Sequence, residues 1–222
     1  MDIAIEQKTE RISVQDWGLI EYKDALQRQM DLVDLVGREL ARETLVFCSH
    51  PPVVTLGRGT REGDVFGWKG PVVEVNRGGR ATYHGPNQIV VYPILDLNHR
   101  GRDLHKYMRL LEEAIVRTLA KFDIQATGHP VQPTDDGEMK EATGVWVASK
   151  KLASIGIGVR KWISFHGLAL NVNYDPQAFL GMRPCGFSRE TMASMEEILN
   201  RPVDRAQVAQ VLKDHLIDLL AV

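Results

Sequence analysis

The sequence has few cysteines, no long apolar run and no excess of charge of one sign. Its 222 residues contain two cysteines, Cys48 and Cys185, too few for the disulfide scaffold of a small secreted protein. No segment approaches the ~18 apolar residues that a membrane-spanning helix needs, and the N-terminus lacks the basic and apolar regions of a secretory signal. We therefore expect a cytoplasmic protein with reduced thiols and no membrane association.

The charge balance argues against nucleic-acid binding. Lysine and arginine number 27 and aspartate and glutamate 29, a formal net charge of -2, whereas a nucleic-acid-binding domain is normally basic. Hydrophobic residues make up 44% and charged residues 25%, close to the globular average, so disorder, collagen and coiled coil are excluded. The length fits one large domain or two small ones, with enough residues for a core.

The apolar spacing predicts helices from Asp16, as N-cap, to about Leu40, from Asp103 to about Phe122, and over 202–220. Short apolar runs predict strands at 44–47, 53–56, 72–75 and 89–95, and more between 144 and 174, with a turn at 85–87 and a hairpin turn at 149–151. Residues 128–142 are expected to form an exposed loop. Because strands and helices do not alternate regularly, we predict an α/β fold of the α+β type, with a mixed, partly antiparallel sheet flanked by helices.

No motif indicates a metal or nucleotide site. The Gly57-Arg-Gly-Thr-Arg61 segment lacks the closing Gly-Lys-Ser/Thr of a phosphate loop, and Ser154-Ile-Gly-Ile-Gly158 opens no helix, as a dinucleotide fingerprint would. The seven histidines have no metal-ligand spacing, and Cys48 with His50 is too little for zinc. We expect neither a metal nor a cofactor.

The segment Arg77-Gly-Gly-Arg-Ala-Thr-Tyr-His84 is the densest polar cluster. Adjacent glycines let a backbone approach a ligand closely, and exposed N–H groups there can hold a carbonyl or phosphate oxygen. The same pattern also fits a tight connection between strands, which is the commoner role of a glycine pair. Both interpretations stay open at this point.

The two cysteines lie in different surroundings. Cys48 ends an apolar strand and is expected to be a buried core residue, whereas Cys185, in Arg-Pro-Cys-Gly-Phe, lies on a predicted turn where a thiol can be exposed, although a small buried hydrophobe is still the commoner role of a free cysteine. A nucleophilic thiol needs a nearby cation or base that favours the thiolate. The candidates are Lys151, His84 and His166, and sequence order does not say which of them approaches Cys185.

Taken together, four blocks resemble the lipoyl(octanoyl) transferases, which have the biotin/lipoate ligase fold. The blocks are Arg77-Gly-Gly-Arg-Ala-Thr-Tyr-His-Gly-Pro with Gln88 and Tyr92-Pro-Ile-Leu-Asp-Leu97; Lys151-Leu-Ala-Ser-Ile-Gly156; Phe165-His-Gly-Leu-Ala-Leu-Asn171; and Pro184-Cys-Gly186. They occur in the family's order, and the resemblance spans roughly residues 14–200. One departure is Asn87, which stands where the family has glycine and can adopt the same left-handed turn conformation.

The resemblance implies one catalytic domain over residues 1–222, acting as a monomer without a cofactor. It implies transfer of an octanoyl group from octanoyl-acyl carrier protein to a lysine of lipoyl domains, in 2-oxoacid dehydrogenase complexes and the glycine cleavage H protein, as the first step of lipoate synthesis. The family's catalytic pair corresponds to Cys185 and Lys151. Its acyl-binding segments correspond to Arg77, Gly78, Gly79, Arg80, Ala81, Thr82, Tyr83, His84, Ser154, Ile155, Gly156, Gly167, Leu168 and Ala169.

The chemistry of these residue types fits such a transfer. Cys185 would exchange with the donor thioester and hold the acyl group until an incoming lysine takes it as an amide. Lys151 would favour the thiolate as an ammonium, or accept a proton from the incoming lysine as a neutral amine. Backbone N–H groups near Cys185 or Gly156 would stabilise the oxyanion, and His84 would position the thioester.

The acyl chain needs an apolar slot, and small residues at Gly78, Gly79, Gly167 and Ala169 leave room for one. Because acyl carrier protein is acidic, a basic surface is also expected. Its candidate residues are Arg58, Arg61, Lys69, Arg160, Lys161, Arg183 and Arg189.

Two alternatives remain open. An ATP-dependent lipoate or biotin ligase of the same fold would activate a free acid as an adenylate and would need no cysteine. A carrier-binding module with an inactive site would bind without chemistry, although the presence of Cys185, Lys151 and His84 argues against it.

Overall fold

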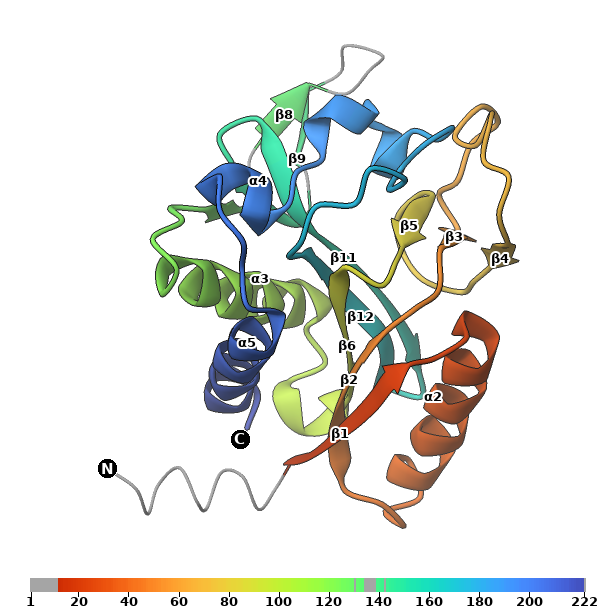
Figure 1. Cartoon of the computed structure of the whole chain (residues 1–222). Helices are drawn as coiled ribbons and strands as arrows, with labels where there is room; N and C mark the ends of the chain where they lie inside the picture. The colour runs from red at the N-terminus through yellow and green to blue at the C-terminus, as the bar shows by residue number, and fades with distance from the viewer. Residues whose placement is uncertain (1–11, 130, 134–138, 142, 222) are drawn as a thin grey trace.

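A computed structural model describes residues 12–129, 131–133, 139–141 and 143–221, and its centre is a seven-stranded sheet (Figure 1). Strand β1 (Ile12–Leu19) runs parallel to β2 (Glu43–Ser49), and every other neighbouring pair in this sheet is antiparallel. After β2 the order is β6 (Gln88–Ile94), β12 (Ile163–Asn171), β11 (Lys150–Arg160), β10 (Val145–Val147) and β7 (Thr127–Gly128). The predicted fold class, a mixed sheet flanked by helices, is confirmed.

A second, three-stranded sheet carries the polar cluster of the sequence. Its order is β4 (Val72–Glu74), β3 (Val53–Leu56), β5 (Thr82–His84). A short pair, β8 (Val131–Pro133) with β9 (Met139–Glu141), lies in the segment that we expected to be a loop, so that prediction is wrong where these strands form. Residues 130, 134–138 and 142 of the expected loop lie outside the described residues.

Helices cover both faces of the large sheet, with α3 (Leu104–Ala120) and α5 (Arg205–Leu220) on one and α2 (Tyr22–Val36) on the other (Figure 1). Along β2, Leu45 and Phe47 pack toward α3 and α5, whereas Val46 and Cys48 pack toward α2, because successive strand side chains point to opposite faces. Strand β6 is buried along its whole length, which explains its unbroken apolar sequence. Helix α4 (Met195–Leu199) is short, and no described helix is long and apolar enough to cross a bilayer.

Two of the three predicted helices form near their expected bounds. Asp103 caps α3 by accepting a hydrogen bond from the Lys106 N–H at 2.9 Å, and Asp204 caps α5 in the same way. The first predicted helix is wrong in its start, because the chain around Asp16 forms β1 and the helix begins only at Tyr22. The reason is tertiary, since residues 12–19 pair with β2, a partner that local periodicity does not include.

Two predicted turns also differ in detail. The β10–β11 turn consists of Ala148 and Ser149, because Val147 pairs directly with Lys150, and Lys151 is therefore a strand residue. Asn87 does not adopt a left-handed conformation; its side chain instead donates a hydrogen bond to the Tyr174 carbonyl at 2.9 Å.

Candidate active site

Cys185 lies at the centre of a tight turn over Pro184–Gly186. Its own backbone is left-handed, with φ 55° and ψ 18°, a conformation that costs energy for a residue other than glycine and that recurs at functional sites. The Cys185 N–H donates to the Ala81 carbonyl at 2.8 Å, and the next N–H donates to Arg183 at 3.1 Å. The thiol is half-buried, and the N–H groups of Cys185 and Gly186 already have backbone acceptors, which leaves Gly156 as the remaining predicted oxyanion site.

Lys151 shares an aromatic pair with Cys185. The rings of Trp146 and Phe187 meet edge to face with centroids 5.1 Å apart, and Cys185 packs against them. The Lys151 Nζ lies 5.4 Å from the Trp146 ring centroid and 5.6 Å from that of Phe187, within cation–π range. Lys151 is 2% exposed, and no described side chain forms an ion pair with it. The structure thus brings together the cysteine and lysine that the resemblance pairs.

A narrow slot opens beside the Cys185 turn. Its wall includes the predicted residues Arg77, Gly79, Thr82, His84, Ser154, Ile155, Gly156, Gly167, Leu168 and Ala169. It also includes four that the acyl-binding prediction did not contain, Tyr22, Val90, Tyr92 and His166. Of the predicted set, Gly78, Arg80, Ala81 and Tyr83 do not line it. The open space is about 40 Å³, so a chain of eight carbons has to push the walls apart as it enters.

The glycines of this region are needed for close packing more than for ligand space. A Cβ on Gly156 would lie 3.1 Å from the Arg77 Cδ, and one on Gly167 would collide with the Val91 carbonyl of the neighbouring strand. Gly79 has φ +81°, which disfavours any other residue. The expectation that Gly167 leaves room for the chain is therefore wrong, because the strand β6 backbone occupies that room.

Arg77 is a buried cation that ties the second sheet to the Gly-Gly turn. Its guanidinium donates to the Thr55 carbonyl at 3.1 Å and hydroxyl at 2.8 Å, and to the carbonyls of Gly78 and Arg80 at 3.0 Å each. Burial lowers the pKa of Arg77, while the ionised forms of Cys185 and Tyr22 act in the opposite direction. Its positive charge therefore faces the slot and the cysteine.

Asp64 braces the Cys185 turn, and the sequence analysis did not identify it. Its carboxylate accepts two hydrogen bonds from the Arg80 guanidinium, one of them at 3.0 Å, and its carbonyl accepts the Arg183 N–H at 2.7 Å. Arg80 in turn fills the space where a side chain on Gly186 would be. The sequence held one indirect signal for Asp64. Arg77 and Arg80 flank the Gly-Gly turn, buried arginines need acceptor groups, and the charged loop that precedes them contains Asp64.

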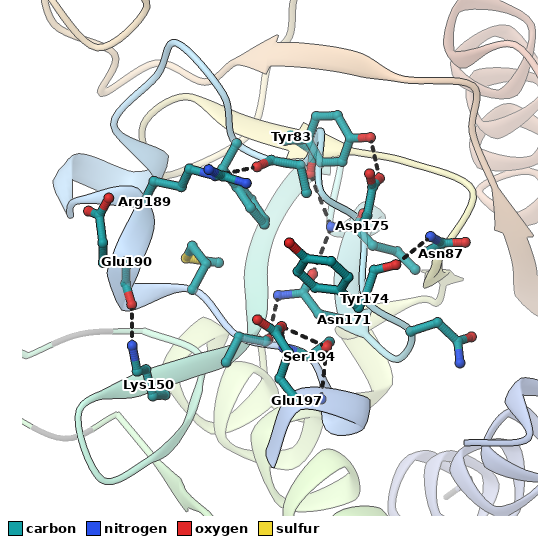
Figure 2. A pocket seen from close by; sticks show the side chains of 16 residues that line it. Tyr83, Asn87, Lys150, Asn171, Tyr174, Asp175, Arg189, Glu190, Ser194 and Glu197 are labelled. Carbon is teal, nitrogen blue, oxygen red and sulfur yellow. Dashed lines mark hydrogen bonds between the residues drawn. The ribbon is translucent and has the colours of Figure 1, made fainter. Parts of the chain in front are cut away.

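Tyr83 points away from the slot, because alternate residues of β5 face opposite sides. Its hydroxyl donates to Asp175 at 2.8 Å, and its ring packs against Trp68 and Phe179. It lines a separate cavity of about 310 Å³, whose polar side chains bond to one another and to backbone carbonyls (Figure 2). Thr82 and His84, on the other side of β5, line the slot.

Three histidines gather at the slot. His50 bonds to the Ile20 carbonyl and the Tyr92 hydroxyl, both at 2.7 Å, while the Nδ1 of His84 and the Nε2 of His166 have no hydrogen-bond partner. Burial lowers the pKa of His50 to about 4 and that of His166 to about 3, and it lowers the pKa of His84 well below its usual value. All three are therefore neutral near pH 7, and Arg77 carries positive charge in the wall that also contains Cys185.

The sequence of this chain is similar to a known family model and to octanoyltransferases of other organisms. Residues 21–217 match the family model described as lipoyl protein ligase A/B catalytic domain. An octanoyltransferase of Bdellovibrio bacteriovorus is 50% identical over 215 residues, covering 93% of this chain and 97% of the relative. An octanoyltransferase of Geobacter metallireducens is 42% identical over 195 residues, covering 88% of this chain and 87% of the relative.

Solved structures share the fold at low sequence identity. A lipoate-protein ligase A bound with ATP has a TM-score of 0.66 and 18% identity, covering 95% of this chain and 85% of that one. A biotin protein ligase of Aquifex aeolicus in complex with biotin and ATP has a TM-score of 0.56 and 13% identity, covering 96% and 72%. These structural similarities support the fold described above, a mixed sheet flanked by helices.

Asp64→Ala is expected to loosen the Cys185 turn. The change removes the carboxylate that holds Arg80, and breaking a buried charge pair costs about 3 kcal/mol of unfolding free energy. Urea unfolding measures the effect. Glu62→Ala, an exposed change in the same loop, is the matched control and should stay within about 0.5 kcal/mol of the parent. Equal effects of the two changes would contradict the role of Asp64.

Stability should fall as the pH drops from 7 to 5. In the unfolded chain the three histidines bind protons below about pH 6.5, but in the folded chain they stay neutral until a much lower pH. Protons thus favour the unfolded state in this window, by roughly 2 kcal/mol for each histidine. Urea unfolding at pH 7 and pH 5 tests this, and His50→Asn should show a smaller loss. A free energy of unfolding that is the same at both pH values would contradict it.

Proposed function

This chain belongs to the lipoyl protein ligase A/B catalytic domain family and is an acyltransferase that transfers octanoyl groups in lipoate biosynthesis, and we propose that it does so through a thioester on Cys185. The donor in this proposal is octanoyl-acyl carrier protein. The acceptors are lysines on lipoyl domains of 2-oxoacid dehydrogenase complexes and on the glycine cleavage H protein. The observation that carries the proposal is that Cys185 and Lys151 pack on one aromatic pair beside the slot.

In the first step the Cys185 thiolate attacks the carbonyl carbon of the donor thioester. The C–S bond to the carrier breaks, the carrier leaves as a thiolate that takes up a proton, and the acyl group stays on Cys185. One thioester replaces another, so the exchange is nearly balanced in energy. The buried charge of Arg77 and the ammonium of Lys151 favour a thiolate at this position.

In the second step the amine of the acceptor lysine attacks the Cys185 thioester. A C–N bond forms, the C–S bond breaks, and the proton lost by the amine passes to the departing Cys185 sulfur through Lys151. Lys151 suits this relay because it lies in a dry aromatic setting without a described carboxylate partner. The amide product is more stable than the thioester, which makes the transfer effectively one-way.

During both steps the acyl chain occupies the slot. Val90, Ile155, Leu168 and Ala169 offer apolar contacts, and each methylene that they cover contributes about 0.8 kcal/mol. His84 lines the same slot and remains neutral, which suits it to positioning rather than to carrying charge. The backbone N–H of Gly156 is the proposed oxyanion donor.

The donor docks, in this proposal, on the loop over residues 57–70 and the segment before Cys185. These two segments are joined, because the N–H groups of Phe66 and Gly67 both donate to the Gly181 carbonyl at 2.9 Å. Phe66 is 70% exposed there, next to exposed Leu180 at 43%. The exposed basic residues of this surface are Arg58, Arg61, Lys69 and Arg183. An apolar centre with a basic rim suits an acidic carrier.

The remaining basic candidates fit this surface less well. The Arg189 side chain bonds to the carbonyls of Ala178 and Pro176 at 3.0 and 2.8 Å, and Arg160 pairs with Asp34. Lys161 follows Arg160 in the β11–β12 turn, beside α2. We further propose that residues 1–222 form one catalytic domain that acts as a monomer in the cytoplasm, where a reactive thiol stays reduced.

Cys185→Ser is expected to abolish octanoyl transfer, since a hydroxyl at this site is a far weaker nucleophile. The protein is incubated with octanoyl-acyl carrier protein, and intact mass reports one octanoyl adduct on the parent and none on the variant. Transfer to a lipoyl domain should fall about a thousandfold or more.

The second cysteine supplies the matched control. Cys48→Ala removes a thiol buried against α2 and should keep the octanoyl adduct. Full-rate lipoyl-domain modification by Cys185→Ser would refute the thioester mechanism. Activity that required ATP and free octanoate would favour a ligase instead.

Reversing the charge of the proposed docking surface should weaken binding of the carrier-protein donor and leave binding of a small octanoyl thioester unchanged. Arg58→Glu with Lys69→Glu is expected to raise the KM for octanoyl-acyl carrier protein about tenfold, while the KM for a small octanoyl thioester such as octanoyl-pantetheine stays the same. Arg160→Glu, at the end of β11, serves as the control. An equal rise for both thioesters, or the same rise from Arg160→Glu, would rule out this surface.

A further inference from the structure

Tyr22 lines both the slot and a second cavity. On one side its ring lines the slot that holds Cys185. On the other side it lines a surface cleft of about 940 Å³ between the start of α2, Pro51 and Pro52, and the chain from Gly67 to Pro71. Among the residues that the structure describes, Tyr22 is the one that lines both cavities. The two cavities therefore meet at Tyr22, the described residue that they share.

The Tyr22 ring is held firmly in this position. It is 3% exposed and stacks on the His84 ring with centroids 5.7 Å apart and an interplanar angle of 16°. It also packs against His50 at 5.1 Å, and its hydroxyl lies 3.4 Å from the Nδ1 of His166. A ring fixed by neighbours on several sides resists displacement, unlike a side chain that is free to change rotamer.

Strand β5 gives a rough path length from Cys185 to this ring, and that length is close to that of an eight-carbon chain. The Cys185 N–H is bonded to Ala81, just before β5, and His84, on which Tyr22 stacks, ends that strand. Three residues of strand span roughly 10 Å. An extended octanoyl group has seven C–C bonds and measures roughly 9 Å, taking about 1.3 Å of advance per bond. The terminal methyl group would therefore reach the Tyr22–His84 stack.

We propose that Tyr22 is the residue that ends the acyl slot and thereby limits the transferred chain to about eight carbons. This inference rests on the proposed function, since it concerns the acyl group carried by Cys185. A chain with four more carbons has to displace the Tyr22 ring, which the stack with His84 and His50 opposes. Without the ring, the extra methylenes would continue from the slot into the surface cleft.

The test compares acylation of Cys185 by octanoyl- and dodecanoyl-acyl carrier protein, with intact mass after acid quench as the readout. In the parent protein, dodecanoyl should load onto Cys185 much more slowly than octanoyl. Tyr22→Ala is expected to raise the ratio of dodecanoyl to octanoyl loading rates about tenfold or more, because four additional methylenes gain apolar contact. Tyr22→Leu removes the ring but keeps an apolar side chain, and it should raise the ratio in the same direction.

Tyr22→Phe is the matched control, since it keeps the ring and removes only the hydroxyl. It should retain the parent's ratio, and thermal unfolding of each variant reports whether it is folded. An unchanged ratio in a folded Tyr22→Ala or Tyr22→Leu variant that still loads octanoyl would overturn the inference while leaving the proposed function intact. A ratio raised equally by Tyr22→Phe would also overturn it. A parent that takes up no octanoyl group on Cys185 would instead refute the proposed function.

Discussion

The buried guanidinium of Arg77 is the interaction on which the geometry of the site depends. It holds β3 through Thr55 and closes the Gly-Gly turn through the carbonyls of Gly78 and Arg80. Its aliphatic part lies against Gly156 of the large sheet, so one side chain fixes the small sheet to the large one. Carbonyls and a hydroxyl accept four of its hydrogen bonds, its buried Nε has no partner, and no described carboxylate pairs with it, so its charge is not neutralised beside the slot.

A second brace positions the nucleophile from outside the slot. Asp64 holds the Arg80 side chain and the backbone before Cys185, and Arg80 supports the Cys185 turn beneath Gly186. The left-handed backbone of Cys185 costs energy, and such strain persists only where the surroundings over-determine it. The two arginines of one short segment thus have different duties: one faces the slot, and the other supports the turn that carries the thiol.

The slot itself combines apolar walls with polar but uncharged aromatic groups. Burial keeps His50, His84 and His166 neutral, so they fill space beside Tyr22 and Tyr92 without adding charge near an acyl chain. Arg77 lines the same slot, so its positive charge lies beside these neutral rings.

The sequence by itself determined the fold class, the long helices and the chemically important segments. Continuous apolar residues identified β6, and the 3.6-residue periodicity with Asp103 identified α3, since these signals are local in the chain. The family resemblance of the motifs pointed to Cys185 and Lys151 as a candidate pair. Only the tertiary structure decided that residues near Asp16 form a strand, that Tyr83 leaves the slot while Tyr22 enters it, and that Asp64 supports the nucleophile. Each of these depends on a partner distant in sequence: β2 for Asp16, the small sheet's orientation for Tyr83, and Arg80 for Asp64. Local periodicity contains no information on such pairings, because burial and hydrogen bonding between remote segments arise only when the chain is folded.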